Sequence, residues 1–320
     1  MRHAKPQERR CSYVVLLEDA AAGGDEIRSL AAYLSSLAVA DCDVVVLDAS
    51  PGEVFEKHHR VLRWVGRHLA IPAGADRVRF ATEVAACEKV IVAGEEVRYT
   101  PADLEQMCGL LESHEVVEPQ DYFDPLPWWG GIDAGRMLVH RGIDPYPDHG
   151  ATFGFRRSAL RGLRGLDLEG GDDHVRRLAA HGAEVFSASE VFIQREPPPL
   201  GDWLRERPRQ ADDDFAMPVK SAFFFAFIPM TLLLALLGGM RIATGYAGAV
   251  AFASTALALR GRIGAAPFFP LRACLFAPLW VLERSVSVYW ALFRKMRGVT
   301  AEPTLPVPDR ASGTRVASGE

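Results

Sequence analysis

Two uncharged apolar stretches near the C-terminus constrain the fold of this 320-residue chain more than any other feature. Residues 221–240, SAFFFAFIPMTLLLALLGGM, and residues 242–259, IATGYAGAVAFASTALAL, contain no charged side chain. About 20 consecutive apolar residues can cross a bilayer as a helix, and the Gly and Ala of the second stretch suit close helix packing there. We therefore expect a transmembrane helical hairpin over residues 218–262. The alternative is two buried helices of a soluble domain.

The charges that flank these stretches predict their orientation. Lys220 precedes the first stretch, Arg260 and Arg262 follow the second, and Arg241 lies in the turn between them. Because positive side chains favour the cytoplasmic side, we expect both ends of the hairpin, and the soluble part of the chain, to face the cytoplasm at the inner membrane.

The segments at the two ends of the chain differ from the hairpin. Residues 263–298 are apolar but interrupted by charges and end in a basic cluster, a pattern typical of an interfacial helix; a third membrane helix is the alternative. Residues 299–320 are rich in Pro, Ser and Gly, so we expect a disordered tail. Residues 1–11 are also expected to be disordered. Only about five apolar residues follow this basic start before Glu18, fewer than a signal peptide needs.

Residues 12–217 alternate between short apolar runs and amphipathic segments. SYVVLL at 12–17 and CDVVVLDAS at 42–50 predict buried strands. The helix expected between them places Ile27, Leu30, Ala31, Leu34 and Leu37 on one face. The further expectations are a helix over 55–70, a strand at 76–80, a helix at 81–88, a strand at 89–96 and a helix at 101–112.

This order of elements predicts an α/β domain with a mostly parallel sheet flanked by helices. In such sheets ligands bind beyond the carboxyl ends of the strands. Asp48 and the pair Glu95 and Glu96 fall at those ends. Two ligand classes are disfavoured: the formal net charge of −5 argues against nucleic acid, and the histidines have no zinc-ligand spacing. The five cysteines form no plausible disulfide framework, which suggests a reducing compartment.

Four segments occur in a specific order along the chain. They read VVVLDASP from residue 44, KVIVAGEEVRYTPADL from 89, HGATFGFRRSALRGLRGLD from 149 and DWLRERPRQADDDFAMP from 202. In this order, ahead of a membrane hairpin, they resemble the membrane-associated glycosyltransferase family 2, which has the GT-A nucleotide-sugar fold. The resemblance runs from about Ser12 to Arg297. It implies a GT-A-like domain over 12–217 that takes a nucleotide-diphosphate sugar and a lipid-linked or cell-envelope acceptor.

The resemblance also implies a donor site with a divalent metal. The family carries an Asp-x-Asp at a strand end, and the matching positions here are Gly94 and Glu96, with Glu95 between them. Glu96 would hold Mg²⁺ or Mn²⁺, because these ions take oxygen ligands, and Asp48, Glu95 and Arg209 would contact the donor. Gly94 lacks the ribose-facing carboxylate. The alternative is a solvated turn whose acidic residues favour the N-terminus of the next helix.

A catalytic base is implied near the segment EGGDDHVRRL. In the family an acidic pair precedes a helix that carries an Arg-Leu pair. With Arg177-Leu178 as that pair, the strict family spacing places Gly170-Gly171 at the acidic positions, and a shift of two residues places Asp172 and Asp173 there. Either aspartate would accept the proton of the acceptor hydroxyl. The alternative is an N-cap and first-turn acid of a surface helix.

The family's QxxRW helix matches the segment ERPRQ, in which Arg209 keeps the arginine and Gln210 replaces the tryptophan. Arg207, Trp128 and Trp129 are the expected acceptor-side residues. Arg207 and Arg209 could instead lie near anionic lipid headgroups, and paired Trp side chains can anchor a protein at a membrane interface. The sequence thus predicts a membrane-anchored glycosyltransferase. The alternative is a catalytically inactive relative that binds a nucleotide or a partner at the membrane.

Overall fold

The computed structural model describes residues 10–17, 24–38, 41–72, 74–143, 151–162, 174–213, 215 and 218–297. These fall into two compact units: residues 1–198 with 249–280, and residues 199–248 with 281–320. Nearly all of the two terminal segments expected to be disordered lies outside the described residues. We describe each unit separately.

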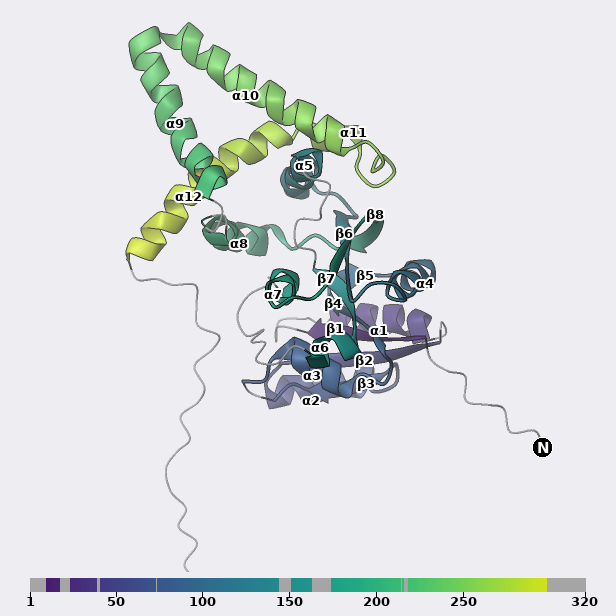
Figure 1. Cartoon of the computed structure of the whole chain (residues 1–320). Coiled ribbons are helices and arrows are strands. Elements are labelled where there is room, and N and C mark those ends of the chain that lie inside the picture. The colour runs from purple at the N-terminus through teal and green to yellow at the C-terminus, as the bar shows by residue number, and fades with distance from the viewer. Residues whose placement is uncertain are drawn as a thin grey trace, which may run out of the picture. The chain divides into compact units, whose positions relative to one another are not determined.

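The first unit contains an eight-stranded mixed sheet in the order β3-β2-β1-β4-β7-β6-β8-β5 (Figure 1). The pairs β1–β2, β1–β4, β2–β3 and β6–β8 are parallel, whereas β4–β7, β6–β7 and β5–β8 are antiparallel. Because β7 runs against both β4 and β6, those two strands are parallel to each other. The carboxyl ends of β1, β2, β4, β6 and β8 therefore lie at one edge. The strands are β1 Cys11–Leu17, β2 Cys42–Asp48, β3 Arg67–Ala70, β4 Lys89–Gly94, β5 Val97–Arg98, β6 Val116–Phe123, β7 Thr152–Arg156 and β8 Val185–Arg195.

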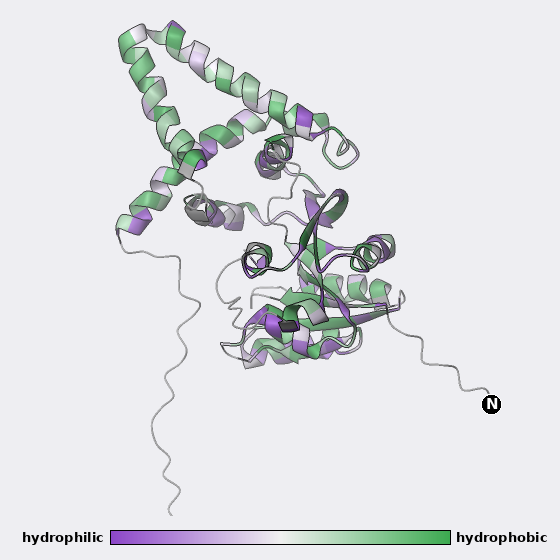
Figure 2. Ribbon diagram, viewed as in Figure 1, coloured by the Kyte–Doolittle hydropathy of each residue, from purple (hydrophilic) through white to green (hydrophobic). Residues whose placement is uncertain are grey.

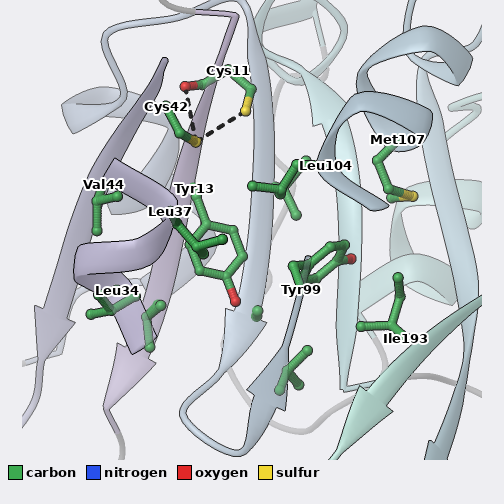
Figure 3. Packing of buried hydrophobic residues seen from close by; sticks show 14 of the residues in the cluster. Cys11, Tyr13, Leu34, Leu37, Cys42, Val44, Tyr99, Leu104, Met107 and Ile193 are labelled. Carbon is green, nitrogen blue, oxygen red and sulfur yellow. Dashed lines mark hydrogen bonds between the residues drawn. The ribbon is translucent and has the colours of Figure 1, made fainter. Parts of the chain in front are cut away.

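Strand β1 is buried along its whole length and contributes to both faces of the sheet. Tyr13 and Val15 belong to one hydrophobic cluster, and Val14 and Leu16 belong to the other. Helix α1 (Gly24–Ala38) covers the first cluster, and the five apolar residues predicted to share one face of this helix are all buried. Figure 3 shows Leu34 and Leu37 of α1 packed beside Tyr13. The predicted α/β class and the strands at 12–17, 42–50 and 89–96 are confirmed.

The segment between β2 and β4 differs from the sequence prediction. The helix expected over 55–70 is shorter, because α2 ends at Leu62 and residues 67–70 form strand β3. Between α2 and β3 the chain passes close to β2 at Gly66, where a Cβ would lie 2.6 Å from the backbone oxygen of Val44. A residue without a side chain is therefore required at this point. The strand expected at 76–80 is wrong as well. Those residues open helix α3, whose N-cap Asp76 accepts a hydrogen bond from Arg79 N.

Strand β6 has no counterpart in the sequence prediction. Its sequence, VVEPQDYF, is almost entirely buried although four of its residues are polar or proline. Pro119 is tolerated because the register with β8 shifts between Pro119 and Gln120. The remaining helices of this part of the chain are α2 Gly52–Leu62, α3 Arg77–Val84, α4 Pro101–Leu110, α5 Trp128–Ile143, α6 Arg157–Gly162 and α7 His174–Ala180.

Two long apolar helices follow. Residues 219–238 of α9 and residues 240–261 of α10 have mean hydropathies of 2.1 and 1.5, and both appear mostly green in Figure 2. By length and composition each could span or associate with a membrane. The C-terminal half of α10 packs directly against α5, where a Cβ at Gly261 would lie 1.9 Å from Leu138 O. The C-terminal helices are α8 Leu200–Asp213, α9 Pro218–Gly238, α10 Met240–Gly261, α11 Leu271–Cys274 and α12 Ala277–Met296.

Candidate functional site

Acidic and basic side chains meet at the edge where the parallel strands end. Glu96 follows β4, Asp121 lies near the end of β6, and Arg195 is the last residue of β8. In open α/β sheets the crevice beyond the carboxyl ends of the strands is the usual ligand position. We refer to Glu96, Arg195 and Asp121 as the strand-end cluster.

Glu96 and Arg195 form the ion pair of this cluster. Arg195 Nη2 lies 2.8 Å from Glu96 Oε1, and the two side chains are 27% and 29% exposed, respectively. A Cβ at Gly94 would lie 2.3 Å from Glu96 Oε2. The Glu96 carboxylate therefore folds back into the space that a side chain at position 94 would need. Gly94 is a steric requirement of this conformation.

The turn that carries Glu96 is held by β5 and β8. Glu196 N donates to Glu96 O at 2.9 Å, and Arg98 Nη2 lies 3.1 Å from Glu196 Oε1. The Arg98 guanidinium also donates to Val97 O at 3.1 Å and lies 5.0 Å from the centre of the Tyr33 ring. Arg98 is therefore engaged in fixing the turn.

Asp121 is the buried member of the strand-end cluster. Its Oδ2 accepts a hydrogen bond from Ala151 N at 2.8 Å, and Ala151 O accepts one from Gly94 N at 3.1 Å. Oδ1 is buried and has no hydrogen-bond partner among the described residues. Burial raises the pKa of Asp121 to about 6, although the Arg195 guanidinium acts in the opposite direction.

Asp48, the predicted donor contact, lies in a separate buried cluster. Its Oδ2 is 2.9 Å from His58 Nδ1 and 3.1 Å from His68 Nε2, and its Oδ1 accepts from Ser50 N at 2.8 Å. Burial opposes ionisation, but the hydrogen bonds from His68, Ser50 and His58 together hold the pKa of Asp48 well below its usual range. Both carboxylate oxygens therefore have protein partners.

The remaining predicted site residues lie in separate segments of the sequence. Asp172 and Asp173 lie outside the described residues. Trp128, at the start of α5, is 60% exposed, and Trp129 Nε1 donates to Pro198 O at 3.1 Å. Glu95 lies in the turn after β4 beside Glu96.

The two arginines of α8 belong to the second unit. Arg207 is buried, donates from Nε to Trp203 O at 3.1 Å and lies over the Trp203 ring at 4.3 Å from its centre. Arg209 lies on the same helix, and its side chain is outside the described part of the structure.

The strand-end cluster does not fit the divalent metal that the sequence resemblance implies. Position 94 offers no side-chain oxygen, and one oxygen of Glu96 is already bound by Arg195. Mg²⁺ and Mn²⁺ need several oxygen ligands. Among the described residues no group of three or more His, Cys, Asp or Glu side chains is arranged to hold a metal ion.

Sequence reasoning found Glu96 but missed Asp121 and Arg195. Asp121 lies in a strand that the apolar pattern did not reveal, and Arg195 approaches Glu96 only through the pairing of β5 with β8. The one indication in the sequence is the polar run EPQD, which precedes two aromatic residues and does not alternate as a surface strand would.

Comparison with solved structures identifies the fold. The chain is similar to the mannosyltransferase PcManGT from Pyrobaculum calidifontis, solved with GDP-Man and Mn²⁺, with a TM-score of 0.50, 17% identity and coverage of 88% of this chain and 87% of that one. Glucosyl-3-phosphoglycerate synthase from Mycobacterium tuberculosis is similar at a TM-score of 0.38 and 15% identity, over 61% of this chain and 74% of that one. No protein-family model and no curated protein sequence matches the chain. The α/β part of the chain has a GT-A-like fold.

Proposed function

We propose that this protein is a membrane-associated glycosyltransferase that transfers a sugar from a nucleoside-diphosphate donor to a lipid-linked or cell-envelope acceptor. The observation that carries the proposal is the strand-end cluster of Glu96, Arg195 and Asp121, which lies at the carboxyl ends of the strands in a GT-A-like sheet, the edge where open α/β sheets usually bind ligands. A mannosyltransferase with a similar fold was solved with GDP-Man.

The reaction is a single displacement at the anomeric carbon. The acceptor oxygen forms a bond to that carbon while the bond from the carbon to the diphosphate oxygen breaks, and the electron pair leaves with the nucleoside diphosphate. Asp172 or Asp173 accepts the proton of the acceptor hydroxyl. This reaction inverts the configuration at the anomeric carbon.

The binding roles follow from the sequence resemblance. Asp48 and Glu95 contact the donor, together with Arg209, and the aromatic faces of Trp128 and Trp129 contact the acceptor. Arg207 is the further acceptor-side residue of the proposal. Helices α9 and α10 anchor the protein, with the α/β domain on the cytoplasmic side of the inner membrane.

Nucleotide-sugar turnover tests the proposal directly. The full chain in detergent micelles is incubated with GDP-mannose or UDP-glucose, and the release of GDP or UDP is measured with and without a membrane lipid extract as the acceptor source. We expect release that increases with the extract and that falls by about a hundredfold or more in the double variant Asp172→Asn, Asp173→Asn. Release that does not differ between the wild type and this variant contradicts the assignment of the base.

A catalytically inactive, nucleotide- or partner-binding membrane protein is the second candidate. The specific observation in its favour is Asp48, whose two carboxylate oxygens are bound by His58, His68 and Ser50 within the protein. This candidate predicts nucleotide binding without turnover of any nucleotide sugar. The two candidates are therefore separated by comparing a binding titration with the release assay on the same preparation.

A further inference from the structure

We propose that Arg195 supplies the positive charge that binds the donor diphosphate, so that this protein binds its nucleotide without a divalent cation. The inference rests on the proposed function, because it concerns the donor side of that reaction. It follows from the disagreement between the metal implied by the sequence resemblance and the side chains that occupy the strand-end cluster.

A nucleoside diphosphate carries several negative charges, and more charge develops on it as the bond to the sugar breaks. An enzyme needs a cation at this position, either a metal ion or a fixed basic side chain. The guanidinium group suits this role because its fork of N–H donors binds two phosphate oxygens at once and because it stays charged at any physiological pH.

Arg195 is the basic residue placed for this role. It lies at the carboxyl end of β8, which is parallel to β6 at the edge where ligands bind in such sheets. Its side chain is 27% exposed, so a ligand can reach it. Its guanidinium carbon also lies 5.7 Å from the centre of the Phe123 ring. Arg98, at the end of the neighbouring strand β5, contacts Tyr33, Glu196 and the backbone of Val97.

Glu96 then occupies the contact on Arg195 that the diphosphate takes when it binds, and we call this the placeholder role of Glu96. Its Oε1 lies 2.8 Å from Arg195 Nη2, the distance of a charge-assisted hydrogen bond, which a phosphate oxygen would replace. Glu96 can adopt this position because Gly94 leaves the space open for its second oxygen. A metal ion on Glu96 would instead have to share the carboxylate with the guanidinium, and the two like charges would repel each other.

Isothermal titration of GDP and of UDP into the full chain in detergent micelles tests the inference. Each titration is made once in EDTA and once in excess MnCl₂. We expect the Kd of the bound nucleotide to agree in the two buffers within about twofold. Arg195→Gln should raise the Kd in EDTA by about tenfold or more, since it removes a charge-assisted contact. Arg195→Lys should give an intermediate value, because it keeps the charge but loses the fork.

Glu96→Gln distinguishes the two roles of this residue by the sign of its effect. If Glu96 is a placeholder, the neutral variant lowers the Kd in EDTA by about two- to fivefold, because the nucleotide no longer competes with a carboxylate for Arg195. If Glu96 is a metal ligand, the same variant abolishes binding that depends on Mn²⁺. A merely structural role of the ion pair predicts weaker binding for both Arg195→Gln and Glu96→Gln.

Arg10→Gln is the matched control, because Arg10 also pairs with a glutamate, Glu105, but at the start of β1 and with a 61% exposed side chain. It should bind nucleotide as the wild type does. Binding that requires Mn²⁺, or an unchanged Kd in Arg195→Gln, overturns the inference and leaves the proposed function standing. Failure of the wild type to bind either nucleotide in both buffers, together with no turnover, overturns the proposed function as well.

Discussion

Replacing Asp121 by asparagine should change how the stability of the protein depends on pH. Asp121 Oδ2 accepts a hydrogen bond from Ala151 N at 2.8 Å, and an asparagine oxygen can accept the same bond. The variant therefore keeps the size and this contact of the side chain but removes its charge. Burial raises the pKa of Asp121 from 3.8 to about 6 in the folded protein.

The sign of the effect follows from proton linkage. A carboxyl whose pKa is higher in the folded state than in the unfolded state stabilises the fold fully below pH 3.8, and this contribution is lost as the pH rises through about 6. The shift of about two units corresponds to about 3 kcal/mol at 1.36 kcal/mol per unit. The asparagine variant has no charge to bury. Its free energy of unfolding relative to the wild type should therefore increase by about 2 kcal/mol between pH 4 and pH 7.5, because part of the contribution is already lost at pH 4.

Urea denaturation in detergent micelles, followed by tryptophan fluorescence, measures this difference at a series of pH values. The quantity of interest is the difference between variant and wild type at each pH, because it cancels the contributions of all other titrating groups. Asp25→Asn is the matched exposed substitution, since the Asp25 side chain is 95% exposed. A flat difference for Asp121→Asn across the pH series would show that this carboxyl does not titrate in the folded state as described.

Three further substitutions test the local structure of the first unit. Gly66→Ala should reduce the free energy of unfolding by about 1–3 kcal/mol, because its Cβ would lie 2.6 Å from a backbone oxygen of β2, whereas Gly52→Ala, with nothing within 4 Å, should not destabilise by this mechanism. Thr100→Ala should lose about 1 kcal/mol in the same denaturation assay, because it removes the capping box of α4. Gly94→Ala should lower the Kd for nucleotide in EDTA, because its Cβ would displace the Glu96 carboxylate from Arg195; an increase in Kd would contradict the placeholder role.

The sequence predicted the strands whose residues are apolar without interruption. β1 and β2 are buried along their whole length, so their composition alone identifies them. β6 is buried to nearly the same extent, but Glu118, Gln120 and Asp121 interrupt its apolar pattern, and no local rule predicts that these side chains are inside. The helix expected over 55–70 was too long because amphipathic spacing continues past the glycine at which the chain turns back to form β3.

The sequence predicted only the part of the candidate site that lies within one continuous segment of the chain. Glu96 follows a recognisable strand, and its distance from the strand end is fixed by the local chain. The ion pair with Arg195 joins residues that are far apart in the sequence, and it exists because β5 crosses to the far side of β8 and pairs there in antiparallel register. Pairing of this kind depends on tertiary structure, which periodicity does not encode.

The two departures from the Asp-x-Asp pattern are physically coupled. Considered separately, Gly94 lacks the carboxylate of the first aspartate, and the side chain of Glu96 is one methylene longer than that of the second aspartate. In the structure the longer side chain of Glu96 folds back over Gly94, so that its second oxygen occupies the space that a Cβ at position 94 would need. A single change at either position alone would leave a clash or a gap. The pair therefore behaves as one unit that directs a carboxylate toward a guanidinium, and the position of Glu96 on Arg195 needs Gly94 and Arg195 to be present together.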